Sequence, residues 1–244
     1  YRRGIAQFDP AYFKKSKLKP WQQELWCIGE LNGQFIAQME TVLDFYNAPA
    51  EEGVVRLTFD ERPCQLLADT VEALPPQKGK RKKVDHEYKR CGVSNILLAY
   101  DMDRGQRYLE TRKQRTKADF AHFWANLALV SFAVARRIDV VLDNLNTHDY
   151  GSFYEHLPLE IAEQLRRQIR FIYTPKHGSW LNLTEIEFAA LARQCLDGRR
   201  IPSLEELDKE AQTWAAARNV KGTMIYWSFT TAKAREKFQR HYDK

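Results

Sequence analysis

Ile138-Asp139-Val140-Val141-Leu142-Asp143 is a short, mostly apolar segment that ends in a carboxylate. Its length and its content of Val and Ile predict a buried β-strand. An acidic residue at the end of such a strand lies where the backbone leaves the sheet, open to solvent and substrate. The pattern recurs in residues 54–59, Val-Val-Arg-Leu-Thr-Phe, which are followed by Asp60. We therefore expect two strands of one sheet to end in aspartates.

Hydrophobic periodicity predicts further elements on both sides of these two strands. The other expected strands span residues 94–100, 107–112 and 169–173, and the expected helices span about 116–134, 154–167, 183–196 and 203–218. Residues 65–68 are a candidate for an additional short strand outside this order. This order of strand, strand, strand, helix, strand, helix, strand, helix is that of the ribonuclease-H-like fold. We expect an α/β protein with a mixed sheet flanked by helices and with helical N- and C-terminal extensions.

The chain divides into three parts by its pattern and composition. We expect residues 1–50 to be a helical lead-in or linker, residues 51–198 the main α/β domain, and residues 199–244 a helical C-terminal extension. An insertion over residues 62–92 carries a basic run at residues 78–83, which is punctuated by Gly and predicts an exposed loop. Because the chain begins with Tyr rather than Met, we also expect a further N-terminal portion.

Composition narrows the classes of function. The chain has 38 Lys and Arg against 32 Asp and Glu, a net charge of +6 that favours a polyanionic partner without requiring one. The four cysteines form no C-x-x-C pair, so a zinc cluster or disulfide framework is not expected and a reducing cytoplasm is. The longest apolar run, residues 127–135, is far shorter than the roughly 18 residues of a membrane span, so no membrane association is expected.

The predicted helix after the last strand offers two candidates for a third carboxylate, Glu185 and Glu187. At about 100° per residue, a core-facing stripe is formed by Phe188, Leu191, Ala192 and Cys195. Glu185 lies about 60° from the centre of this stripe, and Glu187 about 100° away on the other side. We therefore expect Glu185 to face the aspartates along the sheet edge and Glu187 to face solvent.

Three carboxylates brought together repel one another, and at least one has its pKa raised. Two divalent cations about 3.5–4 Å apart turn that repulsion into attraction, and together they support in-line displacement at a phosphodiester. Oxygen ligands of this kind suit Mg²⁺ or Mn²⁺. A structural interpretation stays open beside this one, because an aspartate after a strand often forms a turn and Asn182 with Glu185 could cap the helix.

Two stretches of sequence are more specific than this spacing. Residues 141–148, Val-Leu-Asp-Asn-Leu-Asn-Thr-His, and residues 173–185, Tyr-Thr-Pro-Lys-His-Gly-Ser-Trp-Leu-Asn-Leu-Thr-Glu, resemble the bacterial insertion-sequence branch of the mariner superfamily of DDE transposases. The resemblance extends to Leu-Lys-Pro-Trp at residues 18–21 and Trp-Ser-Phe-Thr-Thr at residues 227–231. It thus covers nearly the whole chain.

This resemblance implies a ribonuclease-H-like core in which Asp60, Asp143 and Glu185 hold two Mg²⁺ or Mn²⁺ ions, with Glu187 as the alternative third ligand. It implies cut-and-paste transposition, in which the ends of an element are cleaved and the freed 3′-hydroxyl attacks target DNA, typically at TA. It also implies transposon ends and target DNA as partners, a homodimer or larger assembly on DNA, and a location in the bacterial cytoplasm with the nucleoid.

Several other residues are candidates for supporting roles. Contacts with DNA phosphates are expected from Lys78, Lys80, Arg81, Lys82, Lys83, Lys176 and His177. Asn144, His148 and Asn182 are expected to support the metal ligands, although each could instead fix its loop by hydrogen bonds. The alternative functions are a structure-specific nuclease on the same fold, a non-catalytic DNA-binding remnant, and a metal-independent hydrolase acting on sugars.

Overall fold

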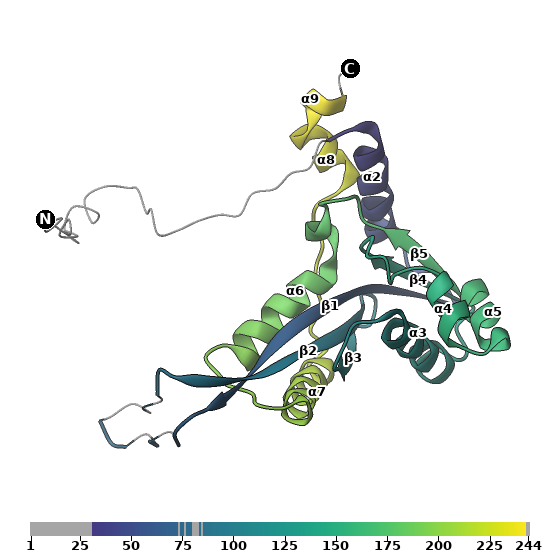
Figure 1. Cartoon of the computed structure of the whole chain (residues 1–244). Helices are drawn as coiled ribbons and strands as arrows, with labels where there is room; N and C mark the ends of the chain where they lie inside the picture. The colour runs from purple at the N-terminus through teal and green to yellow at the C-terminus, as the bar shows by residue number, and fades with distance from the viewer. Residues whose placement is uncertain (1–30, 73, 76, 80–82, 84, 243–244) are drawn as a thin grey trace, which may run out of the picture.

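The protein, described by a computed structural model over residues 31–242 except 73, 76, 80–82 and 84, is built on a single mixed sheet (Figure 1). Its strand order is β3-β2-β1-β4-β5. The strands are β1 (Val54–Asp69), β2 (Tyr88–Asp101), β3 (Gln106–Arg112), β4 (Arg137–Leu142) and β5 (Ile169–Tyr173). β1, β2 and β3 are antiparallel neighbours, whereas β4 and β5 run parallel to β1.

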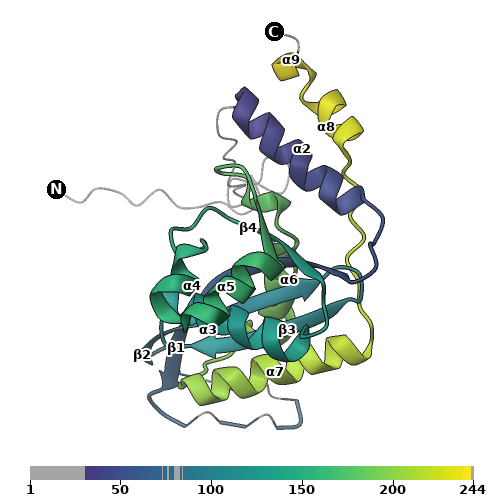
Figure 2. The same ribbon diagram turned by 90° about the vertical axis from the view of Figure 1, so that its right-hand side faces the viewer.

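Helices cover both faces of this sheet (Figures 1 and 2). One face carries α3 (Lys117–Asn126), α4 (Gly151–His156) and α5 (Leu159–Gln168). The other face carries α2 (Gly33–Asn47), α6 (Leu183–Leu191) and α7 (Leu204–Val220). Single π-helical turns follow α3 at Leu127–Ser131 and α6 at Ala192–Leu196, and a 3-10 turn, Ser179–Leu181, precedes α6. The predicted mixed α/β architecture is therefore confirmed.

Alternation along the strands explains the two hydrophobic cores. Leu57 and Phe59 of β1 point to the α3 face, as do Val140 and Leu142 of β4, whereas Val141 lies on the α6 face. Successive side chains of a strand point to opposite faces of its sheet. The central strands are thus apolar on both faces, which requires helices on both sides.

The first strand is longer than predicted. It does not end at Phe59 but continues through Asp60 to Asp69, absorbing the short strand expected over residues 65–68. Its pairing with β4 stops at Thr58 and Val141, while its pairing with β2 continues to Asp69 and Tyr88. β1 and β2 therefore extend beyond the rest of the sheet as a two-stranded ribbon, seen projecting in Figure 1.

The predicted insertion loop over residues 62–92 needs the same correction. Its two ends are strands, and the connection between them covers residues 70–87. Pro63 is accommodated because this part of β1 has a neighbour on one side only, so its missing N–H interrupts no second ladder. A long insertion is stabilised here by pairing with a distant segment, which periodicity within one stretch does not reveal.

α2 and the C-terminal helices lie side by side in both views (Figures 1 and 2). Of the predicted helical lead-in, only residues 31–50 are among the described residues, and they contain α2. α8 (Thr231–Lys237) and the short α9 (Gln239–Tyr242) follow an extended segment after α7. Arg235 donates two hydrogen bonds to Glu40 of α2, at 2.7 and 2.9 Å, and Thr231 bonds Asp44 of the same helix. Within residues 31–242, with the gaps given above, no helix is long and apolar enough to cross a membrane.

Candidate active site

The two aspartates lie at the same edge of the sheet. β1 and β4 are parallel, and their last pair is Thr58 with Val141. Asp60 and Asp143 each come two residues after that pair, so they stand at equivalent positions in the register. Both also follow the alternation that places Thr58 and Val141 on the α6 face. The prediction that these two carboxylates share one edge is therefore met, although Asp60 lies within its strand rather than at the end.

Asp60 carries the clearest electrostatic sign of a crowded acidic site. Burial, together with the negative charges of Asp143 and Glu185, raises the pKa of Asp60 to about 7. A hydrogen bond of 2.8 Å, donated by the backbone N–H of Glu61, opposes this shift without cancelling it. The three predicted carboxylates are thus near enough to interact through space, and the charge of His148 only partly offsets their effect on Asp60.

Glu185 is placed by hydrogen bonds between the start of α6 and β1. Asn182 caps α6 by accepting from the backbone N–H of Thr184, and its amide donates to the carbonyl of Phe59 at 2.8 Å. The hydroxyls of Thr184 and Thr58 are 2.7 Å apart in a buried contact. The predicted role of Asn182 as helix cap is confirmed, and the first turn of α6 is fixed beside Asp60 with Glu185 exposed.

The three carboxylates nevertheless do not form a closed ligand cage. Among the residues that the structure describes, no group of three or more His, Cys, Asp or Glu side chains has the geometry to hold a metal ion. One oxygen of Asp143 is occupied by an ion pair with His148. The structure thus brings the carboxylates into electrostatic contact, and binding a cation would require their side chains to reorient.

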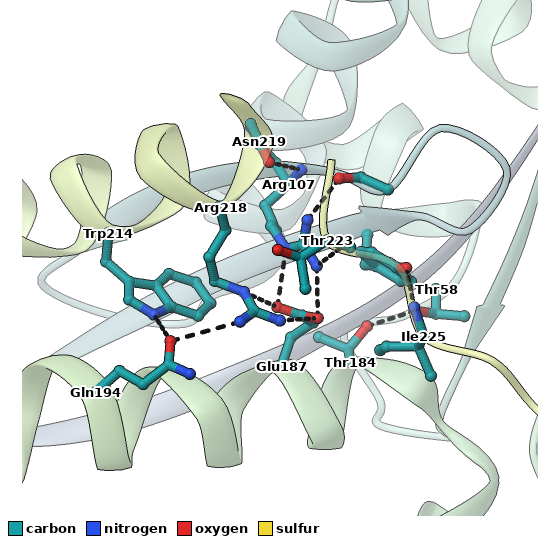
Figure 3. A network of polar contacts seen from close by, with 12 residues as sticks. Thr58, Arg107, Thr184, Glu187, Gln194, Trp214, Arg218, Asn219, Thr223 and Ile225 are labelled. Carbon is teal, nitrogen blue, oxygen red and sulfur yellow. Dashed lines mark hydrogen bonds and ion pairs between the residues drawn. The ribbon is translucent and has the colours of Figure 1, made fainter. Parts of the chain in front are cut away.

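Glu187 does not face solvent, contrary to the sequence prediction. Its side chain is fully buried and is held by the guanidinium groups of Arg107 and Arg218 (Figure 3). Burial alone would raise the pKa of Glu187, but the hydrogen bonds from both arginines keep the pKa below its usual value. The prediction failed because α6 is covered on two sides, by the sheet and by α7, rather than on one. Glu187 is therefore engaged elsewhere, and Glu185 is the exposed carboxylate of this turn.

His148 is buried between two acidic side chains. Its Nδ1 lies 2.7 Å from Oδ1 of Asp143, and its Nε2 lies 3.4 Å from Oε1 of Glu61. Burial tends to lower the pKa of His148, but its contacts with Asp143 and Glu61 prevail and raise the pKa to about 9. The ring also stacks on Phe120 with centroids 4.9 Å apart. His148 thus forms an ion pair with Asp143, and its support of a metal ligand stays a prediction.

Glu61 and Arg115 are two residues of this site that sequence reasoning missed. Glu61 points to the opposite face of β1 from its neighbour Asp60, which strand alternation could have indicated. Arg115 is exposed in the loop before α3. Burial tends to raise the pKa of Asp143, but contact with His148 and the charge of Arg115 hold the pKa below its usual value. A basic side chain thus lies near the aspartates and is free to contact an anion.

The other predicted site residues are distributed over three loops. Asn144 donates from its amide to the carbonyl of Thr174, which supports the structural interpretation of this residue. Lys176 and His177 are exposed in the loop between β5 and α6, and His177 has a left-handed backbone with φ 63°. Lys78 and Lys83 are exposed in the connection at the far end of the β1–β2 ribbon, and Lys80, Arg81 and Lys82 lie outside the described residues.

Comparisons with known proteins agree with this architecture. The sequence profile of a family described as "DDE superfamily endonuclease" matches residues 55–208, which is more than half of the chain and includes all three carboxylates. A search of the curated proteins finds none that matches.

Solved structures of the Mos1 mariner transposase have a similar fold. Its paired-end complex with Mn matches with a TM-score of 0.56 and 16% identity, covering 94% of this chain and 67% of that chain. A paired-end complex with the left transposon end matches with a TM-score of 0.57 and 17% identity, covering 86% and 63%. The isolated catalytic domain matches with a TM-score of 0.52 and 15% identity, covering 88% and 96%. This chain thus spans about two thirds of the transposase in the complexes and nearly all of its catalytic domain, and the predicted ribonuclease-H-like fold is confirmed.

Proposed function

The chain belongs to the DDE superfamily of endonucleases, and we propose that it is a DNA transposase that uses divalent metal ions. In this proposal it cleaves phosphodiester bonds at the ends of a mobile element and joins the freed 3′-hydroxyl to target DNA, at TA. The observation that carries it is the proximity of Asp143 and Glu185 to Asp60, whose pKa is raised to about 7 by burial and by the charges of these two neighbours. Residues 51–198 form the catalytic domain in this proposal, between the lead-in and the C-terminal extension.

The residues of the site fit a divalent cation in their chemistry. The donors are carboxylate oxygens, which Mg²⁺ and Mn²⁺ prefer. The pKa of Asp60 is raised to about 7, first by burial and then by the negative charges of Asp143 and Glu185, which a bound cation would offset. A transposase with this fold has been solved in a complex with Mn. Two ions bound by Asp60, Asp143 and Glu185 would supply an activated water or 3′-hydroxyl and would stabilise the leaving oxygen.

The chain's own groups have separate tasks in this proposal. Asp60 and Asp143 are held on adjacent strands, and His148 fixes the direction of the Asp143 carboxylate through its ion pair of 2.7 Å. Arg115, Lys176 and His177 are exposed around the site and would contact phosphates of the DNA strand. Lys78 and Lys83 would contact phosphates farther away, at the end of the ribbon.

We propose transposon ends and target DNA as the partners, with an assembly of two or more chains on DNA. The reason is the reaction itself, because an element is excised only when both of its ends are cut together. The similar Mos1 complexes are described as paired-end and strand-transfer complexes. A location in the bacterial cytoplasm, with access to the nucleoid, follows from the same proposal.

A strand-transfer assay tests this function directly. A labelled duplex carrying the inverted repeat that flanks the gene is incubated with supercoiled plasmid, the purified protein and Mn²⁺. A transposase joins the labelled 3′-end to the plasmid, and Asp143→Asn abolishes the joined product while binding of the duplex is retained.

The same assay separates the alternatives. A structure-specific nuclease would release cut fragments without ever joining an end, and a non-catalytic remnant would shift the duplex in a gel without cutting it. A hydrolase acting on sugars through a carboxylate pair would retain its activity in EDTA. Joined product that survives Asp143→Asn would contradict the assignment of this residue.

A further inference from the structure

A buried ionic network lies beside the site, on the face of α6 that points away from Glu185. Glu187 accepts from Arg107 of β3 at 2.7 and 2.8 Å, and from Arg218 of α7 at 3.0 and 3.1 Å (Figure 3). The side chains of Glu187 and Arg107 are fully buried, and that of Arg218 is 15% exposed. Three elements far apart in the sequence thus meet at one carboxylate.

The network continues into the C-terminal segment. Arg107 also donates to the carbonyl of Thr223 at 2.7 Å, and its backbone exchanges two hydrogen bonds with the side chain of Asn219. Arg218 lies over the ring of Trp214, whose indole N–H donates to Gln194 in the π-helical turn after α6 (Figure 3). The last turn of α7 and the residues after it are thereby joined to α6 and β3.

Helix geometry relates this network to Glu185. Two residues correspond to about 200° around a helix, so Glu185 and Glu187 leave α6 on nearly opposite sides. The start of α6 is already attached to β1 through Asn182 and Thr184. One attachment point leaves a helix free to roll or tilt, whereas a second attachment one turn along fixes its rotation. The direction of the Glu185 side chain therefore depends on where Glu187 is held.

A buried ion pair is weak evidence of a contribution to stability, because apolar residues of similar volume often stabilise a fold equally well. It does specify one arrangement, since the carboxylate must meet both guanidinium groups at once. The contact surface of α6 is otherwise apolar, with Leu183, Phe188 and Leu191 in the core, and apolar contacts alone tolerate small rotations.

We propose that Glu187 is a positioning residue, which together with Arg107 and Arg218 sets the rotation of α6 and so directs the Glu185 carboxylate toward Asp60 and Asp143. This inference rests on the proposed metal-dependent function of the site. It assigns the C-terminal segment a part in that function, because Arg218 comes from α7 and Arg107 bonds Thr223.

Glu187→Gln tests the proposal, because it keeps the shape of the side chain and removes its charge. Binding of Mn²⁺ alone is measured by the electron paramagnetic resonance signal of the free ion, at a temperature where thermal unfolding shows the variant to be folded. Nicking of supercoiled plasmid gives kcat and KM in parallel. We expect the dissociation constant for Mn²⁺ to rise by about 10- to 100-fold, as is typical when the support of a ligand is lost. We expect kcat to fall while KM for the plasmid is unchanged.

Asp139→Asn is the matched control. Asp139 of β4 is also a buried carboxylate bound by two arginines, Arg137 at 2.9 Å and Arg170 at 2.6 and 2.9 Å. Its hydrogen bonds with Arg170 join β4 to β5 rather than to α6, and it precedes Asp143 in the chain. Its loss should lower thermal stability while Mn²⁺ binding stays within about twofold of the unmodified protein, well below the change expected at Glu187.

The possible outcomes separate the two proposals. If the unmodified chain binds Mn²⁺ and Glu187→Gln binds it no worse than Asp139→Asn does, the positioning role is wrong and the proposed function stands. If the unmodified chain neither binds Mn²⁺ nor nicks plasmid, the proposed function is wrong and the positioning role falls with it. Should Glu187→Gln fail to fold, Arg218→Gln removes the partly exposed partner instead, and unchanged Mn²⁺ binding in that variant overturns the positioning role.

Discussion

Two acidic side chains of this protein, Glu187 and Asp60, have opposite pKa shifts because their neighbours differ. At the interface of α6 and α7, Glu187 is bound by two arginines, and its pKa is held below the usual value despite burial. At the sheet edge, burial raises the pKa of Asp60 to about 7, and the neighbouring carboxylates contribute to this shift. The first arrangement is complete without any added ion. The second carries surplus negative charge, which a divalent cation would balance.

The largest expected effect is on catalysis, and it comes from changing Asp143 at the sheet edge that also carries Asp60. Asp143→Asn removes a charged oxygen ligand while preserving the size of the side chain. Because metal ions contribute several kcal/mol of transition-state stabilisation, the rate of plasmid nicking in Mn²⁺ should fall by at least about 100-fold. The free energy of unfolding serves as the control for folding, and a nicking rate near that of the unmodified protein would remove Asp143 from the site.

The next largest effect comes from changing Glu187, whose charge is balanced by Arg107 and Arg218. Glu187→Gln leaves two guanidinium groups with no carboxylate, and Arg107 has no exposed side-chain surface. Breaking a buried pair in this way destabilises a protein by about 3–5 kcal/mol. Urea unfolding at pH 7 measures the change. A loss below about 1 kcal/mol, the size expected of an exposed pair, would mean that water reaches this network freely.

Asp60→Asn should stabilise the protein, whereas Glu187→Gln destabilises it. This opposite sign makes Asp60→Asn the sharpest test of the difference between the two regions. The pKa of Asp60 is about 7 in the folded protein, against about 3.9 in an unfolded chain. The folded state therefore holds more protons between these values, and stability falls as the pH rises from about 4 to about 7. Asn does not ionise, so the variant should be more stable by about 4 kcal/mol at pH 8 and nearly unchanged at pH 4.

This comparison is made by urea unfolding in EDTA, so that no metal ion compensates the charge. Glu187→Gln, measured at the same pH, is the control, because its free energy of unfolding should fall rather than rise. A lower stability of Asp60→Asn at pH 8 would show that the Asp60 carboxylate is already balanced within the protein, as Glu187 is.

The smallest expected effect on stability comes from changing His148. Its side chain forms ion pairs with both Asp143 and Glu61. Its pKa is about 9 in the folded protein, against about 6.5 unfolded. The raised pKa contributes stability in full below about pH 6.5, and this contribution is lost as the pH rises through about 9. His148→Gln should therefore destabilise the protein by about 3 kcal/mol more at pH 6 than at pH 10. A difference that is constant across this pH range would indicate a neutral imidazole.

The features that could be predicted from the sequence are those set by a few neighbouring residues. The strand at residues 138–142, which ends before Asp143, and the cap at Asn182 follow from short patterns, and the structure agrees with both, whereas Asp60 lies within β1 rather than at its end. His148 was singled out because it follows Asp143 by five residues, and the two side chains form an ion pair.

The features that were missed depend on segments far apart in the chain. The β1–β2 ribbon arises because residues 60–69 pair with residues 88–98, and the burial of Glu187 arises because Arg107 and Arg218 approach it from β3 and α7. A helical wheel identifies one apolar stripe, but it does not show that a second face is covered by charged partners. The distant arginines were visible in the sequence only as surface-type residues.

Diffusion of Mn²⁺ into crystals of the protein, located by anomalous scattering, tests the central claim most directly. The account predicts ions bound to oxygens of Asp60 and Asp143, with Glu185 turned toward them and, with both sites filled, a separation of about 3.5–4 Å. Anomalous peaks found only away from these carboxylates, with Asp60 still protonated at pH 8, would contradict it.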